Sequence, residues 1–276
     1  MNILNIKNIL FAITFLGATM LLSGCDVDAE QTLPDRSWEL VWSDEFNGVA
    51  GSAPDATKWT YDLGTGENGW GNGEFQSYTR DVANVSLDGN GNLMITAIRN
   101  AGPSYTSARV KTQGLFEQQY GRIEARIKTP TGPGIWPAFW MLGSNIDEVG
   151  WPQCGEIDIM EQRGQESTIT HGSVHGPGYS GGNAVTKPYG LTDGRFDTDF
   201  YVYAVEWGAD YIDFFVNDFL YKRVTPADVT GEWVYNKSFF LLFNVAVGGT
   251  FVGFPVTDTP FPQSMYIDYV KVYKQK

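Results

Sequence analysis

The segment "YVYAVEWGADYIDFFVNDFLYKRV" (201–224) decides the fold class. It contains three short runs rich in aromatic and β-branched residues, which favour strands. Gly-Ala-Asp and Asn-Asp separate the runs, and these residues favour tight turns. Short apolar runs joined by such turns predict three consecutive antiparallel strands.

The same pattern continues on both sides of this segment. "NVSLDGNGNLMITAIR" (84–99) predicts a hairpin around Gly-Asn-Gly. "YGRIEARIKTP" (120–130) alternates apolar and polar residues, as a strand with one buried face does. "FFLLFNVAV" (239–247) and "SMYIDYVKVYK" (264–274) complete the set. With no long helical periodicity and no repeat, the pattern predicts an all-β sandwich or barrel and does not choose between them.

Composition limits the possible partners. The 276 residues are 42% hydrophobic, which is enough for one large domain with a real core. A formal net charge of −13 argues against nucleic acid or an anionic membrane surface as a partner. A neutral substrate is compatible with that charge. The 9 Trp, 14 Tyr and 17 Phe offer many aromatic surfaces.

The N-terminus reads as a targeting segment. Lys7 precedes an apolar run at 9–22, which is too short for an ordinary membrane span but fits a signal peptide. The run ends in Leu-Ser-Gly-Cys25, which resembles the lipobox of bacterial lipoproteins, where the chain is cleaved before a cysteine that receives lipid. We therefore expect residues 1–24 to be removed, residues 25–36 to be a lipid-anchored tether, and residues 37–276 to form the functional domain.

This interpretation implies an exported lipoprotein held at a bacterial membrane, on the periplasmic side or at the cell surface. The alternative is a plain secretory signal in which Cys25 is incidental. If Cys25 carries lipid, Cys154 is a lone thiol, because the chain has only two cysteines.

The segment "CGEIDIMEQRG" (154–164) holds three acids with an irregular spacing. On a regular strand Glu156 and Asp158 share one face, while Glu161 would point with the isoleucines into the core. A buried unpaired carboxylate is costly. One extra residue, a β-bulge at or near Met160, would return Glu161 to the face of the other two acids.

Acids crowded on one face suit glycoside hydrolysis. Mutual repulsion keeps at least one of them protonated at neutral pH. A retaining glycosidase needs one ionised carboxylate as nucleophile and one protonated carboxyl as acid, about 5–5.5 Å apart. Asp158, lying between the two glutamates, could orient Glu156. Two other interpretations remain open from the spacing alone, a solvated surface or a carboxylate site for calcium.

The same segment, preceded by "WPQ", resembles the active-site strand of glycoside hydrolase family 16 in its bulged E-x-D-x-x-E form, which typifies laminarinase-like endo-β-1,3-glucanases. Further family-like motifs occur in family order over residues 38–276. They include "WSDEFNG" (42–48), "GWGNGEFQSYT" (69–79), "YGRIEARIK" (120–128), "GIWPAFWMLG" (134–143), "NVAVGG" (244–249) and "YIDYVKVYK" (266–274).

The resemblance implies a β-jelly roll, a sandwich of two curved antiparallel sheets with an open substrate cleft on the concave face. It also implies that Glu156 is the nucleophile, Asp158 the assisting residue and Glu161 the acid/base, with no redox or organic cofactor.

Aromatic ring faces can stack on sugar rings. Trp136 and Trp140 are four apart, so a strand would place both on one face, and they resemble tryptophans that flank the family's cleft. Core packing is the alternative for both. The other candidate substrate contacts are Trp151, Asn72, Glu74, His175 and Arg109, whereas His171 is expected to be structural.

The family also implies one structural calcium ion away from the cleft. Its expected ligands are Glu45, a backbone carbonyl near Gly91, and Asp268, although these acids could simply lie at strand ends.

We therefore expect a monomeric, retaining endo-glycosidase that cleaves internal β-1,3 bonds of laminarin-type β-glucans. Alternatives within the family are mixed-linkage glucan or a marine galactan such as agar, porphyran or carrageenan. Sulfated galactans would favour a basic cleft, and this acidic chain offers few basic residues. A non-catalytic glucan-binding protein on the same fold would have no need of crowded acids, and a structural surface lipoprotein would leave the cleft motifs unexplained.

Overall fold

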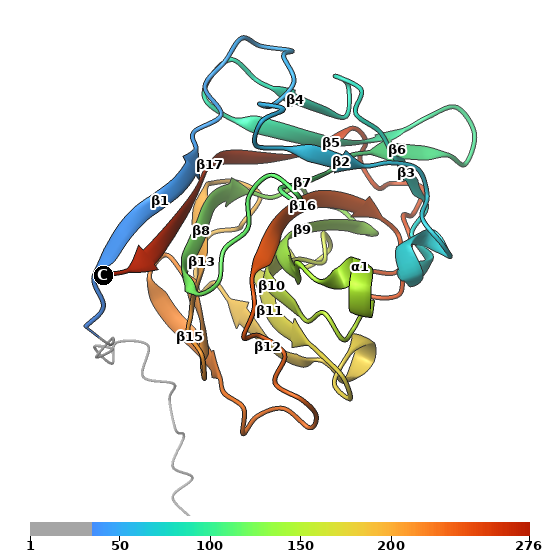
Figure 1. Ribbon diagram of the computed structural model, residues 1–276. Coiled ribbons are helices and arrows are strands. Elements are labelled where there is room, and N and C mark those ends of the chain that lie inside the picture. The colour runs from blue at the N-terminus through green and yellow to red at the C-terminus, as the bar shows by residue number, and fades with distance from the viewer. Residues whose placement is uncertain (1–34) are drawn as a thin grey trace, which may run out of the picture. The chain divides into compact units, whose positions relative to one another are not determined.

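The computed structural model in Figure 1 describes residues 35–276. The predicted signal segment, Cys25 and nearly all of the predicted tether lie outside the described residues. The described chain folds into two stacked sheets, so the sandwich is confirmed and the barrel is excluded (Figure 1). Among residues 35–276, no helix has the length and apolar content needed to cross a bilayer.

The larger sheet contains ten strands of the described chain, in the order β15-β14-β13-β8-β17-β5-β6-β3, with β1 also paired to β17 and β4 to β5. Every pairing in it is antiparallel except that of β3 with β6. The strands are β1 (Trp38–Asp44), β3 (Gln76–Tyr78), β4 (Val85–Leu87), β5 (Leu93–Arg99), β6 (Tyr105–Ser107), β8 (Gly121–Lys128), β13 (Tyr201–Trp207), β14 (Ile212–Val216), β15 (Phe219–Val224) and β17 (Gln263–Gln275).

The smaller sheet has seven antiparallel strands within the described residues, in the order β12-β11-β10-β9-β16-β7-β2. They are β2 (Thr60–Asp62), β7 (Arg109–Lys111), β9 (Ile135–Gly143), β10 (Glu156–Glu161), β11 (Ile169–His175), β12 (Val185–Gly190) and β16 (Phe239–Val247). The short helical elements are η1 (Gly69–Gly73), α1 (Ile146–Val149) and η2 (Gly181–Asn183).

The three strands expected within 201–224 are β13, β14 and β15, and they pair antiparallel as predicted. The turn between β14 and β15 contains Asn217 at φ 48° and Asp218 at φ 64°. Asn and Asp tolerate this left-handed backbone better than most residues, which explains why the sequence places them at a tight hairpin turn.

The main core lies between the sheets. On β8 the alternation predicted from the sequence buries Ile123, Ala125 and Ile127 completely. They pack in one cluster with Ile157 of β10 and Phe243 of β16, which belong to the other sheet. Burial of such side chains contributes about 1.5–3 kcal/mol each.

β16 explains how the smaller sheet supports a site. All nine of its residues are buried, although the strand alternates between two faces. Leu241 and Phe243 pack in the core between the sheets. Leu242 and Asn244 point to the opposite face, where they line a cleft. The strand is therefore apolar throughout because it serves both the core and the cleft floor.

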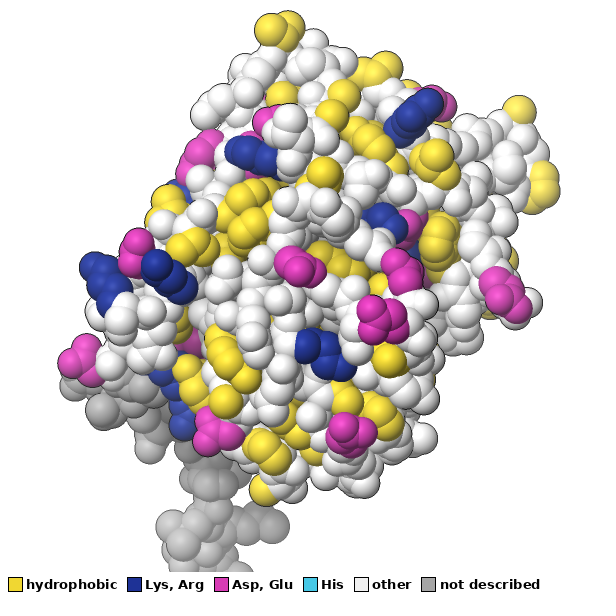
Figure 2. All heavy atoms as spheres, viewed as in Figure 1, with side chains coloured by type: hydrophobic (Ala, Val, Ile, Leu, Met, Phe, Trp, Pro, Cys, Tyr) yellow, Lys and Arg dark blue, Asp and Glu magenta, His cyan; other side chains and the backbone are white. Residues whose placement is uncertain are grey.

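Charge is spread over the face seen in Figure 2. Figure 2 shows one face of the molecule, on which acidic and basic side chains are scattered and hydrophobic side chains gather in small groups between them. The start of the described chain lies beside its end, because Trp38 pairs with Gln275 (Figure 1).

Candidate active site

A cleft of about 860 Å³ lies across the smaller sheet. Its lining includes all ten residues that the sequence proposes for catalysis or substrate contact. β10 supplies the three catalytic acids, β9 supplies two tryptophans, and β11, β7, η1 and two loop positions supply the rest. The ten are Asn72, Glu74, Arg109, Trp136, Trp140, Trp151, Glu156, Asp158, Glu161 and His175.

The bulge expected in β10 is present. Asp158 lies opposite Trp140 of β9, and Met160 lies opposite Phe139, the next residue along β9 in the antiparallel direction. Ile159 therefore has no residue opposite it on β9, and the register with β11 shifts at the same place. The extra residue lets Ile159 and Met160 stay buried while Glu161 joins the cleft.

Proximity and burial change how the acids hold protons. Burial, followed by the negative charge of Asp158, raises the pKa of Glu156 to about 8. The same two causes raise the pKa of Glu161 well above its usual range. Asp158 itself is only 3% exposed. The cluster therefore retains at least one proton at neutral pH, which glycosidic acid catalysis requires.

The indole N–H groups of two cleft tryptophans are hydrogen-bonded to the catalytic glutamates. Trp136 donates to Glu161 Oε1 at 3.0 Å, and Trp151 donates to Glu156 Oε2 at 2.9 Å. Both donors favour the ionised carboxylate and oppose the upward pKa shifts. With their N–H groups engaged, these residues can offer only ring faces and edges to a ligand.

Trp140 is held by a residue that sequence reasoning missed. Its indole donates to Asn244 Oδ1 at 2.7 Å, and Asn244 is only 3% exposed. Asn244 is the one polar residue in the apolar run 239–247, and that isolated amide was the signal that could have identified it.

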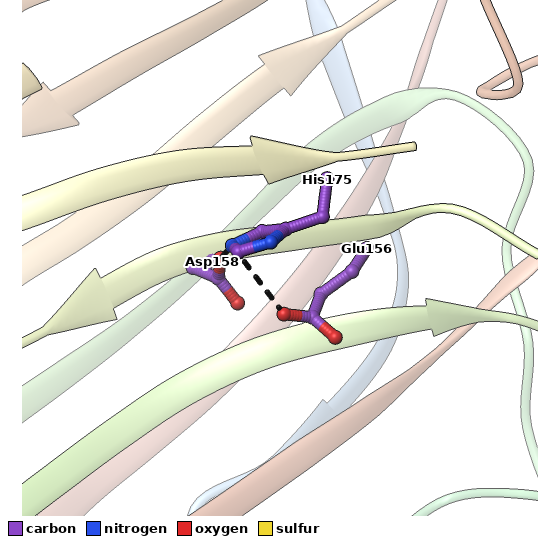
Figure 3. A group of neighbouring side chains, drawn as sticks. All are labelled: Glu156, Asp158 and His175. Atoms are coloured by element: carbon purple, nitrogen blue, oxygen red, sulfur yellow. Dashed lines mark ion pairs between the residues drawn. The ribbon is translucent and has the colours of Figure 1, made fainter. Parts of the chain in front are cut away.

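His175 faces the acids. Its Nε2 lies 3.0 Å from Asp158 Oδ2 and 3.6 Å from Glu156 Oε1 (Figure 3). Burial lowers the pKa of His175, but the charges of Asp158 and Glu156 outweigh burial and raise the pKa to about 10. Its position suits control of the acid cluster, in addition to the substrate contact expected from the sequence.

A second contact of His175 opposes that rise in pKa. The backbone N–H of Gly181 donates to Nδ1 at 3.1 Å, so Nδ1 must carry a lone pair. The ring that fits this contact is neutral, with its proton on Nε2, and the contact therefore argues against so large a rise in the pKa of His175. Protonating Nδ1 as well would place two N–H groups against each other.

The same contact bears on metal binding. Glu156, Asp158 and His175 offer ligand atoms that lie within 4.8 Å of one another. A metal bound at Nε2 would need the ring proton on Nδ1, where the Gly181 N–H already points. The observed hydrogen bonds therefore favour acid–base chemistry over metal binding at this cluster.

Arg109 and Glu74 form a buried network at another part of the cleft. Arg109 is 7% exposed, and its guanidinium lies 3.9 Å from Glu74 Oε2. Glu74 also accepts hydrogen bonds from Asn72 Nδ2 at 3.1 Å and from Gln76 Nε2 at 2.6 Å. Arg109 is thus a buried cleft residue and not a solvated surface charge.

Three aromatic rings lie close to the same guanidinium, those of Trp70, Tyr78 and Trp140. Its carbon lies 4.4 Å from the ring centre of Trp70 and 5.2 Å from that of Trp140. Trp70 was not among the predicted site residues, although it lies in the quoted segment 69–79. Its backbone has φ 55°, an uncommon value for a residue other than glycine.

Cys154 and His171 stay outside the cleft lining. Burial raises the pKa of the Cys154 thiol to about 11, which argues against a nucleophilic role. His171 is 8% exposed and packs edge-on against Phe251, in agreement with a structural role.

The expected calcium ligands lie near one another on the larger sheet. Strand pairing sets Ile267 opposite Leu93 and Val270 opposite Asp44, which brings Asp268 close to the segments of Glu45 and Gly91. The backbones of Glu45 and Gly91 are close, because a Cβ built at Gly91 would lie 4.0 Å from the Glu45 carbonyl oxygen.

Each of the two acids also has a cationic neighbour. Glu45 Oε1 lies 3.2 Å from Lys271 Nζ, and Asp268 Oδ2 lies 2.5 Å from Arg126.

Comparison with known proteins identifies relatives of this chain. Residues 70–270 match the model of Glycosyl hydrolases family 16. The chain is 38% identical to a beta-glucanase of Rhodothermus marinus, with 99% of this chain and 98% of that protein covered. It is 41% identical to the clotting factor G alpha subunit of Tachypleus tridentatus, covering 87% of this chain but only 34% of that longer protein.

A solved structure agrees with these matches. The laminarinase catalytic domain of Thermotoga maritima MSB8 superposes with a TM-score of 0.81 at 45% identity, covering 87% of this chain and 99% of that one. The family match spans more than half of the sequence and includes the bulged strand and the cleft. The chain belongs to glycosyl hydrolase family 16.

Proposed function

We propose that the protein is a retaining endo-glycosidase that hydrolyses internal β-1,3-glucosidic bonds of laminarin-type β-glucans. The observation that carries the proposal is the bulged strand, which brings Glu156 and Glu161 into the same cleft with Asp158 between them in sequence. The similarity to a laminarinase and a beta-glucanase supports this class of substrate.

In the first step Glu161 donates its proton to the glycosidic oxygen while Glu156 attacks the anomeric carbon. The bond to the leaving sugar breaks and a glycosyl ester forms on Glu156. Glu161, now ionised, removes a proton from water, and the resulting hydroxide displaces Glu156 and restores both groups. Configuration is retained because the anomeric carbon is inverted twice.

The environment of the acids supports this division of roles. Asp158 lies beside His175, whose Nε2 is 3.0 Å from Asp158 Oδ2. Negative charge on Asp158 raises the pKa of Glu161 and so preserves the proton that the leaving oxygen needs. The hydrogen bond from Trp151 offsets part of the rise in the pKa of Glu156 and so favours the ionised form that a nucleophile requires.

The experiment is digestion of a polysaccharide panel containing laminarin, mixed-linkage glucan, agarose and carrageenan. We expect cleavage of laminarin at internal bonds, and no hydrolysis by Glu156→Gln. Glu117→Gln, which changes an exposed glutamate outside the cleft, is the matched control and should retain activity. Laminarin left intact while a galactan is cut would refute the substrate. Equal glucan binding by both proteins without hydrolysis would favour a non-catalytic binding protein.

We further propose that the mature protein is a monomer anchored to a bacterial membrane by lipid on Cys25. The apolar run before the Leu-Ser-Gly-Cys sequence supports this proposal. Cys25→Ser should release the protein from membranes, and continued membrane association would contradict lipidation. The proposed occupant of the Glu45, Gly91 and Asp268 site is one structural calcium ion.

A further inference from the structure

Four aromatic rings form a continuous row outside the cleft lining. Phe75 stacks on Phe254 with centroids 4.7 Å apart and planes 15° apart, and Tyr105 lies 6.3 Å from Phe75 at 19°. Phe261 continues the row at 5.2 Å from Tyr105. We call these four residues the rim patch. Three separate chain segments contribute to it, so this stack of rings is a product of the tertiary fold.

Two rings of the rim patch are exposed, whereas Tyr105 and Phe261 are half-buried against the core. Phe75 is 48% exposed and Phe254 is 54% exposed, and the neighbouring Val256 is 52% exposed. In the described chain, the other aromatic residues among the exposed large hydrophobics are Trp151 in the cleft and Phe219 on β15. Adjacent exposed rings of this kind mark interaction sites more often than they serve stability.

The rim patch is separated from the cleft by the thickness of one backbone segment. A Cβ at Gly248 would meet Phe254 at 3.1 Å and Phe75 at 3.4 Å. A Cβ at the next residue, Gly249, would meet the ring of Trp136 at 3.3 Å. The two consecutive glycines therefore have the rim patch on one side and a cleft tryptophan on the other.

Backbone hydrogen bonds hold this boundary in place. The Phe75 N–H donates to the Val247 carbonyl at 2.8 Å, and the Thr250 N–H donates to the Asn72 carbonyl at 2.9 Å. Thr250 and Asn72 line the cleft, whereas Phe75 points to the outside. A polymer that leaves the cleft past Trp136 would meet the exposed rings next.

The chemistry of the rim patch suits a neutral sugar chain. The apolar C–H face of a pyranose stacks on an aromatic ring. Arg99 lies 4.7 Å above Phe261 and donates to the Val256 carbonyl at 3.2 Å, so this cation is held against the half-buried end of the row. The exposed end of the row offers the apolar ring surface of Phe75 and Phe254.

We propose that the rim patch is a second binding site for β-glucan, which holds the part of a long chain that extends beyond the cleft. This inference rests on the proposed function, because it takes the cleft ligand to be a glucan. It predicts that affinity for a polymer depends on residues that do not reach the reacting bond.

The test measures binding of the Glu156→Gln protein to an insoluble linear β-1,3-glucan, so that hydrolysis does not interfere. Introducing Phe75→Ser and Phe254→Ser together into the Glu156→Gln protein should raise its apparent Kd for the insoluble glucan by about tenfold. Phe219→Ser, which changes a similarly exposed phenylalanine on β15, is the matched control and should leave the Kd unchanged. Phe254→Trp keeps an aromatic face and should preserve binding.

Kinetics in the active protein give a second readout. The protein carrying Phe75→Ser and Phe254→Ser with Glu156 intact should have a higher KM for long laminarin but the same KM for a short β-1,3-oligosaccharide. Loss of folded protein would not change the ratio of these two KM values. Unchanged binding and an unchanged KM ratio would overturn the proposal. The proposal would also be overturned if the two substitutions converted a dimer to a monomer and left glucan binding intact. The rim patch would then be an interface between copies of the chain. If the Glu156→Gln parent binds no β-1,3-glucan, the proposed function itself fails.

Discussion

Replacing Trp151 with phenylalanine removes a single hydrogen-bond donor from the carboxylate of Glu156 and leaves an aromatic ring in its place. The lost contact is the 2.9 Å bond from the indole N–H to Glu156 Oε2. This donor stabilises the ionised carboxylate, so its removal raises the pKa of Glu156. Glu156 must be ionised to act as the nucleophile, and the acid limb of the pH–rate profile should therefore move to higher pH.

The size of the expected shift in the pKa of Glu156 follows from the exposure of Trp151, the residue that donates the hydrogen bond. A hydrogen bond to a charged group contributes about 1.5–3 kcal/mol when it is well buried. Trp151 is 47% exposed, so water replaces part of the lost bond and the net loss should be about 1 kcal/mol. Since 1.36 kcal/mol corresponds to one pKa unit, the acid limb should shift by about 0.7 unit.

The assay is kcat/KM for laminarin as a function of pH, in the wild type and in two matched variants. Trp136→Phe removes the corresponding donor from Glu161, which acts in its protonated form. Loss of this hydrogen bond should raise the pKa of Glu161, move the alkaline limb to higher pH and widen the profile. Trp151→Phe should instead narrow the profile from the acid side. An alkaline-limb shift in Trp151→Phe, or the same response in both variants, would refute the assigned roles.

Three further predictions concern stability. The raised pKa of Glu156 means that folding favours its protonated form, so this group's contribution to stability is lost as pH rises from its unfolded value of 4.5 through about 8. Glu156→Gln should therefore raise Tm at pH 8 but not at pH 4, and an equal change at both pH values would contradict the assigned shift. Calcium at about 100 times its Kd should raise Tm by about 5–10 °C, and EGTA or Asp268→Asn should abolish the rise, whereas an unaffected Tm would exclude the ion. Gly172→Ala places a Cβ 2.3 Å from the Tyr221 hydroxyl and should lower the free energy of unfolding in urea by about 1–3 kcal/mol. Gly190→Ala, whose Cβ has no atom within 4 Å, is the control, and equal losses in both would argue against the steric cause.

The sequence predicted the features that depend on local spacing. Alternation in 120–130 and the turns in 201–224 predicted strands that the structure contains, because side chains on a strand change face at every residue. The spacing of Glu156, Asp158 and Glu161 predicted the bulge, because regular pairing would bury a carboxylate in the core. The choice of a sandwich over a barrel came from family resemblance, since strand periodicity is the same in both.

The hydrogen-bond partners of each site residue could be identified only from the tertiary structure. Asn244 accepts a hydrogen bond from Trp140 across 104 sequence positions, and the Gly181 N–H sets the tautomer of His175 from a separate loop. Neither contact leaves a local periodic signal.

The sequence by itself determined which residues lie on the cleft face of β10, since spacing and the cost of burying a charge are local properties. The tertiary structure decided which partners those residues meet, and hence their pKa values and the position of the rim patch. Pairing between distant strands fixes those distances, and strand pairing depends on how the whole core packs.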